Sequence, residues 1–137
     1  AGPAFSHGEF EDVAVGYFLE RGRVDAGRAG GIDRLRASPF TRTGPWNDGG
    51  DDRATRHLAP QHRDFGLFKV PSLRNVAMTA PYMHNGRLET LAAVVRHYSE
   101  IDEERLHADG SRLVRPLRLD DGAQADLVAF LRSLTPE

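Results

Sequence analysis

The sequence predicts a single domain, residues 1–137, built mainly of α-helices joined by long ordered loops. Apolar residues recur at helical spacing in the second half, whereas no set of segments alternates convincingly in the manner of strands. Fourteen glycines and eight prolines indicate many turns, and only 39% of the residues are hydrophobic. Because this is a modest supply for a core, we expect either a small core with many ordered loops or a core that a cofactor, a metal or a partner domain completes.

Charge and cysteine content exclude several classes of function. A net charge of −2 gives no basic footprint for nucleic acid. The chain has no cysteine, so it holds no disulfide, thiolate metal site or cysteine nucleophile. No run of residues reaches the ~18 apolar residues of a membrane span. The first residues show neither a methionine start nor a signal peptide, and we expect that the chain was cut from a longer protein.

The first half is expected to be mostly loop with one short helix. The apolar residues of segment 1–20 fit neither helical nor strand spacing. Residues 28–37 can form a helix that carries Ile32 and Leu35. Residues 38–61 are rich in turn-forming types and are predicted to be loop. The acidic residues of this loop lack the spacing of an EF-hand, which favours a solvated loop over a calcium site: Asp48, Asp51 and Asp52.

A rigid turn and a helix follow in the second half. Residues 72–77 are expected to form one or two helical turns, and the sequence TAPYMHNG, residues 79–86, is a turn by composition. A helix is then predicted over residues 88–100, with Glu89 or Thr90 in its first turn. Its apolar face is formed by Leu88, Leu91, Val94, Val95 and Tyr98.

The last helix is the clearest element of the sequence. Asp120 or Asp121 is expected to cap its N-terminus, and Pro136 to end it. One stripe of the helix is apolar and is expected to face the core: Leu127, Phe130, Leu131 and Leu134.

Tyr98 is the first candidate for chemistry. It lies on the apolar face of its helix, so its ring is expected to point inward, where the phenol oxygen needs a partner. Periodicity alone favours a core tyrosine bonded to a backbone carbonyl over a phenolate ligand to iron, the role that tyrosine has in some haem proteins. His97 is turned by about 100° from Tyr98 on a helix, and we expect it to face solvent.

The other candidates lie in or near the turn. His84 could ligate a metal, contact a haem propionate or brace the loop through its ring nitrogens, and bracing is favoured. Met78 and Met83 could be soft axial ligands to haem iron, but methionine in a core is commoner. The sequence shows no nucleophile elbow, phosphate loop or catalytic pair of carboxylates.

One long segment carries a family resemblance. The sequence FKVPSLRNVAMTAPYMHNGRLETLAAVVRHYSE closely resembles the signature of bacterial di-haem cytochrome c peroxidases and their MauG-type relatives, F-K-x-P-[ST]-L-R-N-x-x-x-T-x-P-Y-x-H-[DN]-G followed by a helix. The last helix, DGAQADLVAFLRSLTPE, resembles the final helix of that family. The start, AGPAFSHGEFEDVAVG, resembles the segment that follows the second haem attachment motif.

The resemblance implies a cytochrome c-like haem domain, of which this chain is the C-terminal portion. It departs from the family in one respect, because no C-x-x-C-H motif is present. The implied haem c would therefore be attached outside residues 1–137, in a haem-bearing N-terminal part of the same protein. The alternative is a haem-free binding or scaffold module derived from that fold, and an absorption spectrum with a Soret band separates the two.

The resemblance also implies roles for individual residues. Tyr98, which follows His84 by fourteen positions, corresponds to the distal iron ligand of the second haem, where tyrosine marks the MauG type and methionine the electron-transfer peroxidases. The backbone carbonyls of Thr79 and Pro81 correspond to ligands of a structural calcium ion. Further cofactor-binding or domain-interface roles fall to Arg74, Asn75, Met83 and His84.

The implied activity is that of a haem-dependent oxidoreductase in the intact protein, while the activity of this chain alone stays open. Such an enzyme uses peroxide to oxidise a protein or a small reductant through a tyrosine-ligated second haem, which stores the second oxidising equivalent. The implied partner is an electron-donor protein or an oxidisable protein substrate, and the implied location is the periplasm.

Overall fold

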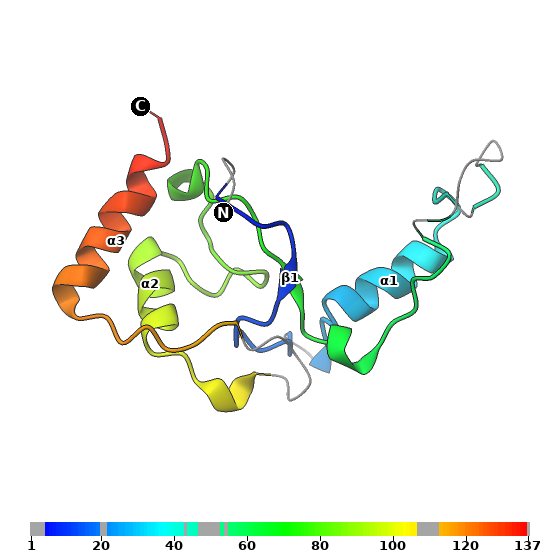
Figure 1. Cartoon of the computed structure of the whole chain (residues 1–137), viewed down its shortest axis with the longest axis horizontal. Coiled ribbons are helices and arrows are strands. Elements are labelled where there is room, and N and C mark those ends of the chain that lie inside the picture. Colours follow the sequence, from blue (N-terminus) through cyan, green and yellow to red (C-terminus); the bar gives the residue numbers. More distant parts are fainter. Residues whose placement is uncertain are drawn as a thin grey trace.

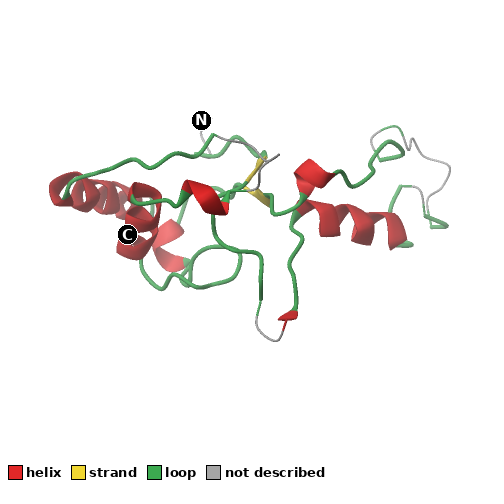
Figure 2. Cartoon of the chain, turned by 90° about the horizontal axis from the view of Figure 1, so that it is seen from below, coloured by secondary structure: helices red, strands yellow, loops and turns green. Residues whose placement is uncertain are grey.

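The computed structural model describes residues 5–19, 22–42, 44–46, 53, 55–106 and 113–136. In Figure 1 they form a body, which contains α2, α3 and β1, and an arm, which carries α1; Figure 2 shows the same elongated outline from below. The helices are α1 (Arg28–Ala37), α2 (Leu91–Ser99) and α3 (Asp121–Ser133), with short 3-10 turns η2 (His62–Asp64), η3 (Val76–Met78) and η4 (Glu103–Arg105). The strands are β1 (Phe10–Glu11) and β2 (Phe68–Lys69).

Helix α1 has the bounds that the sequence predicts, and its start is fixed on the segment before β2. The Arg28 amide donates to the Leu67 carbonyl over 2.8 Å, and its guanidinium pairs with Asp64 over 3.2 Å. Gly27 precedes the helix with φ of 58°, and a Cβ there would collide with the Leu67 carbonyl. Glycine is therefore required where the arm meets the body.

The packing of α2 on α3 makes the core of the body. Leu91, Val95 and Leu131 are buried together, and Leu127 packs against them from α3. Figure 1 shows the two helices side by side. The predicted apolar stripes are confirmed in part, because Leu91 and Val95 of α2 and Leu127 and Leu131 of α3 lie in this core, whereas Phe130 stays 46% exposed.

Both core helices begin at capping side chains. Thr90 Oγ1 accepts from the Ala93 amide over 3.1 Å, and Asp120 Oδ1 accepts from the Ala123 amide over 2.8 Å. Helix α2 starts three residues later than predicted, because Leu88 pairs with Tyr82 in an antiparallel bridge instead of entering the helix. Thr90, at the N-cap position, pairs a backbone amide that the helix itself leaves without an acceptor.

The predicted mainly α class is confirmed only in part. Helices are the longest regular elements of the described residues, but loops connect them over long stretches, and a small antiparallel sheet was not expected. In this sheet Phe10 pairs with Lys69 and Glu11 with Phe68. A strand of two residues is too short to show a period of two, so its sequence carries no detectable pattern.

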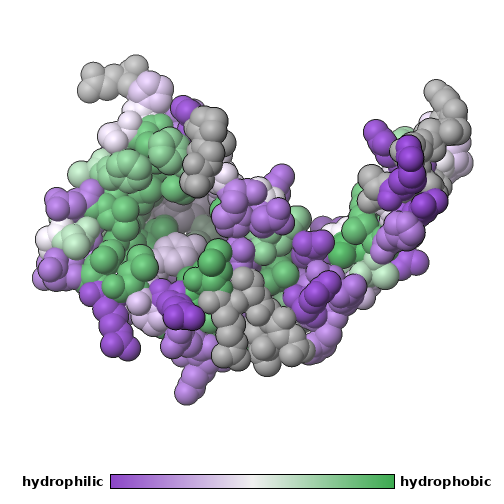
Figure 3. Space-filling model, in the orientation of Figure 1, coloured by the Kyte–Doolittle hydropathy of each residue, from purple (hydrophilic) through white to green (hydrophobic). Residues whose placement is uncertain are grey.

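The body presents an apolar, hollowed surface. Figure 3 shows hydrophobic residues gathered around a depression in the region of α2 and α3. No large side chain among the described residues is completely buried, so the core is thin, as the low hydrophobic content predicts. None of the helices in the described ranges is long and apolar enough to cross a membrane. The acidic residues Asp48, Asp51 and Asp52 lie outside the described residues.

Truncation of Leu91 tests the importance of the α2–α3 contact. We expect Leu91→Ala to lower the free energy of unfolding by about 2–5 kcal/mol, because it opens a cavity at a buried site. Leu117→Ala is the matched control, since this side chain is 53% exposed, and its cost should stay below about 0.5 kcal/mol. Denaturant unfolding of the purified protein measures both, and equal costs would contradict the assigned core.

Candidate functional site

The turn before α2 is held by several hydrogen bonds. The Tyr82 amide donates to the Leu88 carbonyl over 2.6 Å, and the Tyr82 hydroxyl donates to the Val76 carbonyl over 3.1 Å. Two side chains tie the turn to the N-terminal segment: Asn85 Nδ2 donates to the Gly16 carbonyl over 3.5 Å, and Arg87 donates to the Phe18 carbonyl over 3.2 Å. The Ala80–Pro81 peptide bond is cis.

His84 lies in this turn with both ring nitrogens buried. Its ring stacks on Phe68 of β2, with centroids 3.5 Å apart and planes 5° from parallel. Neither nitrogen has a hydrogen-bond partner among the described residues, so His84 braces the turn by stacking, and the predicted bracing through its nitrogens is wrong. Burial lowers the pKa of His84; the negative charge of Asp25 partly offsets this, and the positive charge of Arg87 adds to it. An imidazole buried in this way is neutral at neutral pH.

Tyr98 lies near the C-terminal end of α2 and is half-buried, although it is not among the side chains that pack on the core of Leu91, Val95 and Leu131. Its hydroxyl donates to no backbone carbonyl within the described part of the chain, where a core tyrosine would have such a partner. Burial raises the pKa of the Tyr98 phenol, so the group is neutral in the absence of a nearby cation. The position thus combines an apolar setting with an oxygen that is available to a ligand.

His97 does not face solvent, and this prediction is wrong. Its Nε2 lies 2.7 Å from the Val13 carbonyl, and its ring meets the Tyr98 ring edge to face at 5.4 Å between centroids. Helix α2 is covered on two sides, by α3 and by the segment that follows β1. The prediction that His97 faces solvent assumed that only one side of α2 is covered. The apolar stripe of a helix does not reveal that a loop covers another side of it.

Arg74 and Asn75 lie at the C-terminal end of α3. The Asn75 amide donates to the Leu134 carbonyl over 3.1 Å, and Asn75 adopts the left-handed conformation with φ of 59°. The Arg74 guanidinium lies 5.9 Å from the centre of the Phe5 ring. Met83 is half-buried within the turn, at φ of 67°. Met78, by contrast, is 79% exposed, so it is not the core methionine that the sequence favoured.

Thr79 and Pro81 lie on the surface just before the turn. Thr79 Oγ1 donates back to the Val76 carbonyl over 3.0 Å. Within the described ranges, no hydrogen bond ends on the backbone carbonyls of Thr79 and Pro81. The described residues form no cluster of three or more histidine and acidic side chains that could hold a metal ion.

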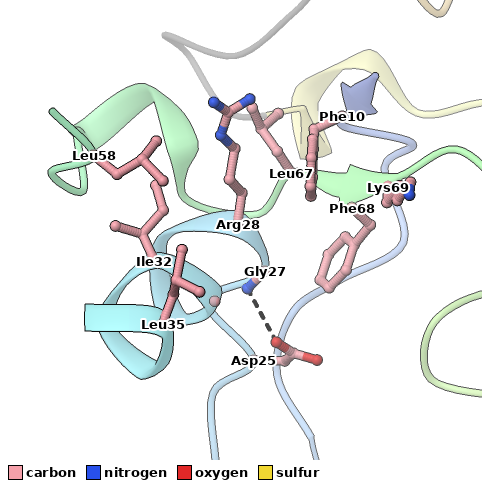
Figure 4. A pocket seen from close by; sticks show the side chains of 11 residues that line it. Phe10, Asp25, Gly27, Arg28, Ile32, Leu35, Leu58, Leu67, Phe68 and Lys69 are labelled. Atoms are coloured by element: carbon pink, nitrogen blue, oxygen red, sulfur yellow. Dashed lines mark hydrogen bonds between the residues drawn. The ribbon is translucent and has the colours of Figure 1, made fainter. Parts of the chain in front are cut away.

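A pocket of about 500 Å³ lies where the arm meets the body, and the sequence did not predict it. Figure 4 shows Ile32, Leu35 and Leu58 on one side and Phe68 on the other, with the Gly27 amide donating to Asp25. Phe68 also stacks on His84, so this pocket and the turn share a wall. The pocket could not be predicted from the sequence, because it forms only where α1 lies beside β2, and no local sequence pattern reveals that contact. The complete lining consists of Phe10, Asp25, Gly27, Arg28, Gly31, Ile32, Leu35, Leu58, Leu67, Phe68 and Lys69.

The predicted site residues thus fall into three neighbouring places along one stretch of chain. Arg74 and Asn75 adjoin the end of α3, the turn contains Thr79 to His84, and Tyr98 is on α2. Within the described residues, no hydrogen bond or ring contact joins Tyr98 directly to His84. The three places are connected through the α2–α3 core, to which Leu73, Val76 and Tyr82 also contribute, and through the hydrogen bonds of the turn.

Comparisons with known proteins identify relatives of this arrangement. No family model matches the chain. It is 43% identical over 70 residues to methylamine utilization protein MauG of Methylorubrum extorquens, covering 51% of this chain and 19% of the relative. It is 37% identical over 87 residues to cytochrome-c peroxidase IdrP1 of Pseudomonas sp. strain SCT, covering 61% of this chain and 22% of the relative.

A solved structure agrees with these relatives over a longer stretch. The crystal structure of a MauG-like protein associated with microbial copper homeostasis superposes with a TM-score of 0.53 and 29% identity, covering 94% of this chain and 33% of that chain. The chain spans about a fifth of the length of the curated relatives. The resemblance seen in the sequence is therefore confirmed: this chain is similar to a segment of MauG and of cytochrome-c peroxidases.

Proposed function

We propose that this chain is part of a haem-dependent oxidoreductase of the di-haem peroxidase or MauG type, with Tyr98 as an axial ligand to haem iron. The observation that carries the proposal is the Tyr98 phenol, which is half-buried, has a raised pKa, and makes no hydrogen bond to a described residue. A tyrosine in such a setting is unusual unless another group satisfies its oxygen. The similarity to MauG and to cytochrome-c peroxidases supplies that group as haem.

The residues present fit a haem. The hollowed apolar surface in Figure 3 offers contact to a large apolar ring system, and the thin core of the body leaves hydrophobic side chains such as Phe5 and Phe130 partly exposed. The chain has no cysteine, so it would contribute an axial ligand and apolar walls, while the covalent attachment of haem c would come from outside residues 1–137. We propose that the haem domain has the cytochrome c-like fold.

Tyr98 would decide the redox character of the site. When bound, the haem supplies one-electron redox chemistry driven by peroxide. Burial raises the pKa of the Tyr98 phenol, and a metal cation bound at the oxygen would lower it, so that the phenol would release its proton to solvent. The resulting phenolate is a hard anionic donor, so it stabilises iron in high oxidation states over reduced iron. We therefore propose an oxidation of a protein or a small reductant, beyond simple electron transfer.

The turn and its neighbours would form the edge of this site. His84 offers two buried nitrogens without partners, which suit a hydrogen bond to a haem propionate or to another part of the protein. Met83 would contribute an apolar surface beside it. Arg74 and Asn75, at the exposed end of α3, would contact the haem edge or the haem-bearing N-terminal part of the same protein.

Calcium and location complete the proposal. The free carbonyls of Thr79 and Pro81 are hard oxygen donors, which calcium prefers, and we propose that they bind it together with ligands from outside this chain. We further propose a periplasmic location, and either an electron-donor protein or an oxidisable protein substrate as the partner.

The Tyr98 ligand is tested by Tyr98→Phe. We expect the fold to remain nearly intact, because the change removes one oxygen from an apolar face, while the absorption spectrum of the ferric and the peroxide-treated protein changes. Tyr82→Phe is the matched control: it removes a phenol oxygen that bonds Val76, so it should cost about 1 kcal/mol of stability and leave the spectrum unchanged. Wild-type spectra for Tyr98→Phe in both states would rule out the ligand.

The calcium site is tested by adding and removing the ion. Because calcium would bind the folded state, it should raise the melting temperature, and a chelator should lower it again. Magnesium is the control, since it demands a smaller and more regular oxygen cage and should have a weaker effect. A crystal structure should place the Thr79 and Pro81 carbonyls about 2.3–2.6 Å from the ion. The same melting temperature with calcium, magnesium and chelator would refute the site.

The burial of His84 predicts sensitivity to acid. Its pKa is lowered in the folded state, whereas the unfolded chain keeps a value of about 6.5. Below that pH the unfolded state binds the proton first, so stability should be full above about pH 6.5 and fall as the pH drops toward the folded pKa. His84→Phe, which can still stack on Phe68, should flatten this dependence. His57→Phe, at an exposed histidine, should not. Parallel curves for the wild type and His84→Phe would exclude His84 as the cause.

A further inference from the structure

The C-terminal end of α2 is held from two directions by hydrogen bonds to distant segments. On one side the carbonyls of Tyr98 and Ser99 accept from the amides of Leu117 and Arg118, each over 3.0 Å. On the other side His97 Nε2 lies 2.7 Å from the carbonyl of Val13, a residue 84 positions earlier. These contacts restrict both the translation of the helix end and its rotation about the helix axis.

The bond to Val13 has a defined direction. A backbone carbonyl oxygen only accepts, so His97 must carry its proton on Nε2 and donate it. The acceptor is itself fixed, because Val13 lies between two buried residues and the Ala14 amide donates to the Asp12 carboxylate over 2.9 Å. Helix α2 is thereby attached to a firmly held part of the N-terminal segment.

Tyr98 is the residue that this attachment controls. It directly follows His97, and the two rings meet edge to face with centroids 5.4 Å apart and planes 73° apart. A rotation of α2 that broke the bond to Val13 would also turn the Tyr98 side chain. The Tyr98 hydroxyl itself has no hydrogen bond to a described residue that would hold it in place.

We propose that His97 is a positioning residue for Tyr98: its hydrogen bond to the Val13 carbonyl fixes the rotation of α2 and, with it, the direction of the Tyr98 phenol. This inference rests on the proposed function, because the direction of the phenol matters only if its oxygen is a ligand. His97 would not contact the iron. His97 would hold the Tyr98 phenol in one of several possible orientations, so that the phenol would bind the iron in one way only.

Two substitutions separate the hydrogen bond from the ring. His97→Gln keeps a side-chain N–H that can reach the Val13 carbonyl, whereas His97→Phe keeps a ring beside Tyr98 but has no donor. Arg96→Gln is the matched control on the same turn of α2, at an exposed side chain. The readout is the electron paramagnetic resonance spectrum of the ferric protein purified with its haem, recorded beside that of Tyr98→Phe.

The expected result is a single ligation state in the wild type, in Arg96→Gln and in His97→Gln. His97→Phe should show a mixture that includes the Tyr98→Phe signal. A wild-type spectrum for His97→Phe would overturn the inference, and so would an equal mixture in His97→Gln and His97→Phe, because the bond to Val13 would then not matter. If Tyr98→Phe itself matched the wild type, the proposed function would fail, and the inference with it. The two failures are therefore distinguishable.

Discussion

The burial of Leu91 and Val95 of α2 against Leu131 of α3 is the contact on which the site depends. The same helix carries Tyr98, begins directly after the braced turn, and bonds the N-terminal segment through His97. Because α2 has only nine residues, its own hydrogen bonds cannot stabilise it in isolation. Its position, and with it the position of the phenol, comes from packing on α3 and from the bonds at its C-terminal end.

Desolvation gives the two central side chains opposite pKa shifts with the same consequence. Burial raises the pKa of the Tyr98 phenol and lowers that of the His84 imidazole, so both are neutral at neutral pH. Neither ring makes a hydrogen bond to a described residue through these polar atoms, and the two His84 nitrogens are also buried. A protein usually tolerates such atoms where a ligand or a partner completes them. A haem beside Tyr98 and a polar group beside His84 would account for both features at once.

The sequence predicted the features that depend on local pattern. The cap at Asp120 follows from capping chemistry, and the burial of Leu91, Val95 and Leu131 follows from helical periodicity. The turn and the resemblance to MauG and cytochrome-c peroxidases followed from one long motif. The small sheet, the pocket beside Phe68 and the contact of His97 with Val13 could not be predicted, because each joins segments far apart in the chain. Loops that cover a helix leave no periodic trace in its sequence.

The central claim is that the Tyr98 oxygen ligates haem iron, and locating the iron tests it most directly. Crystals of the protein purified with its haem, measured at the iron absorption edge, give the iron position by anomalous scattering. The account predicts a haem iron bonded to the Tyr98 oxygen, with the porphyrin against the apolar surface near α2 and α3. An iron bonded to another side chain, or apolar side chains closed over Tyr98 without haem, would contradict it.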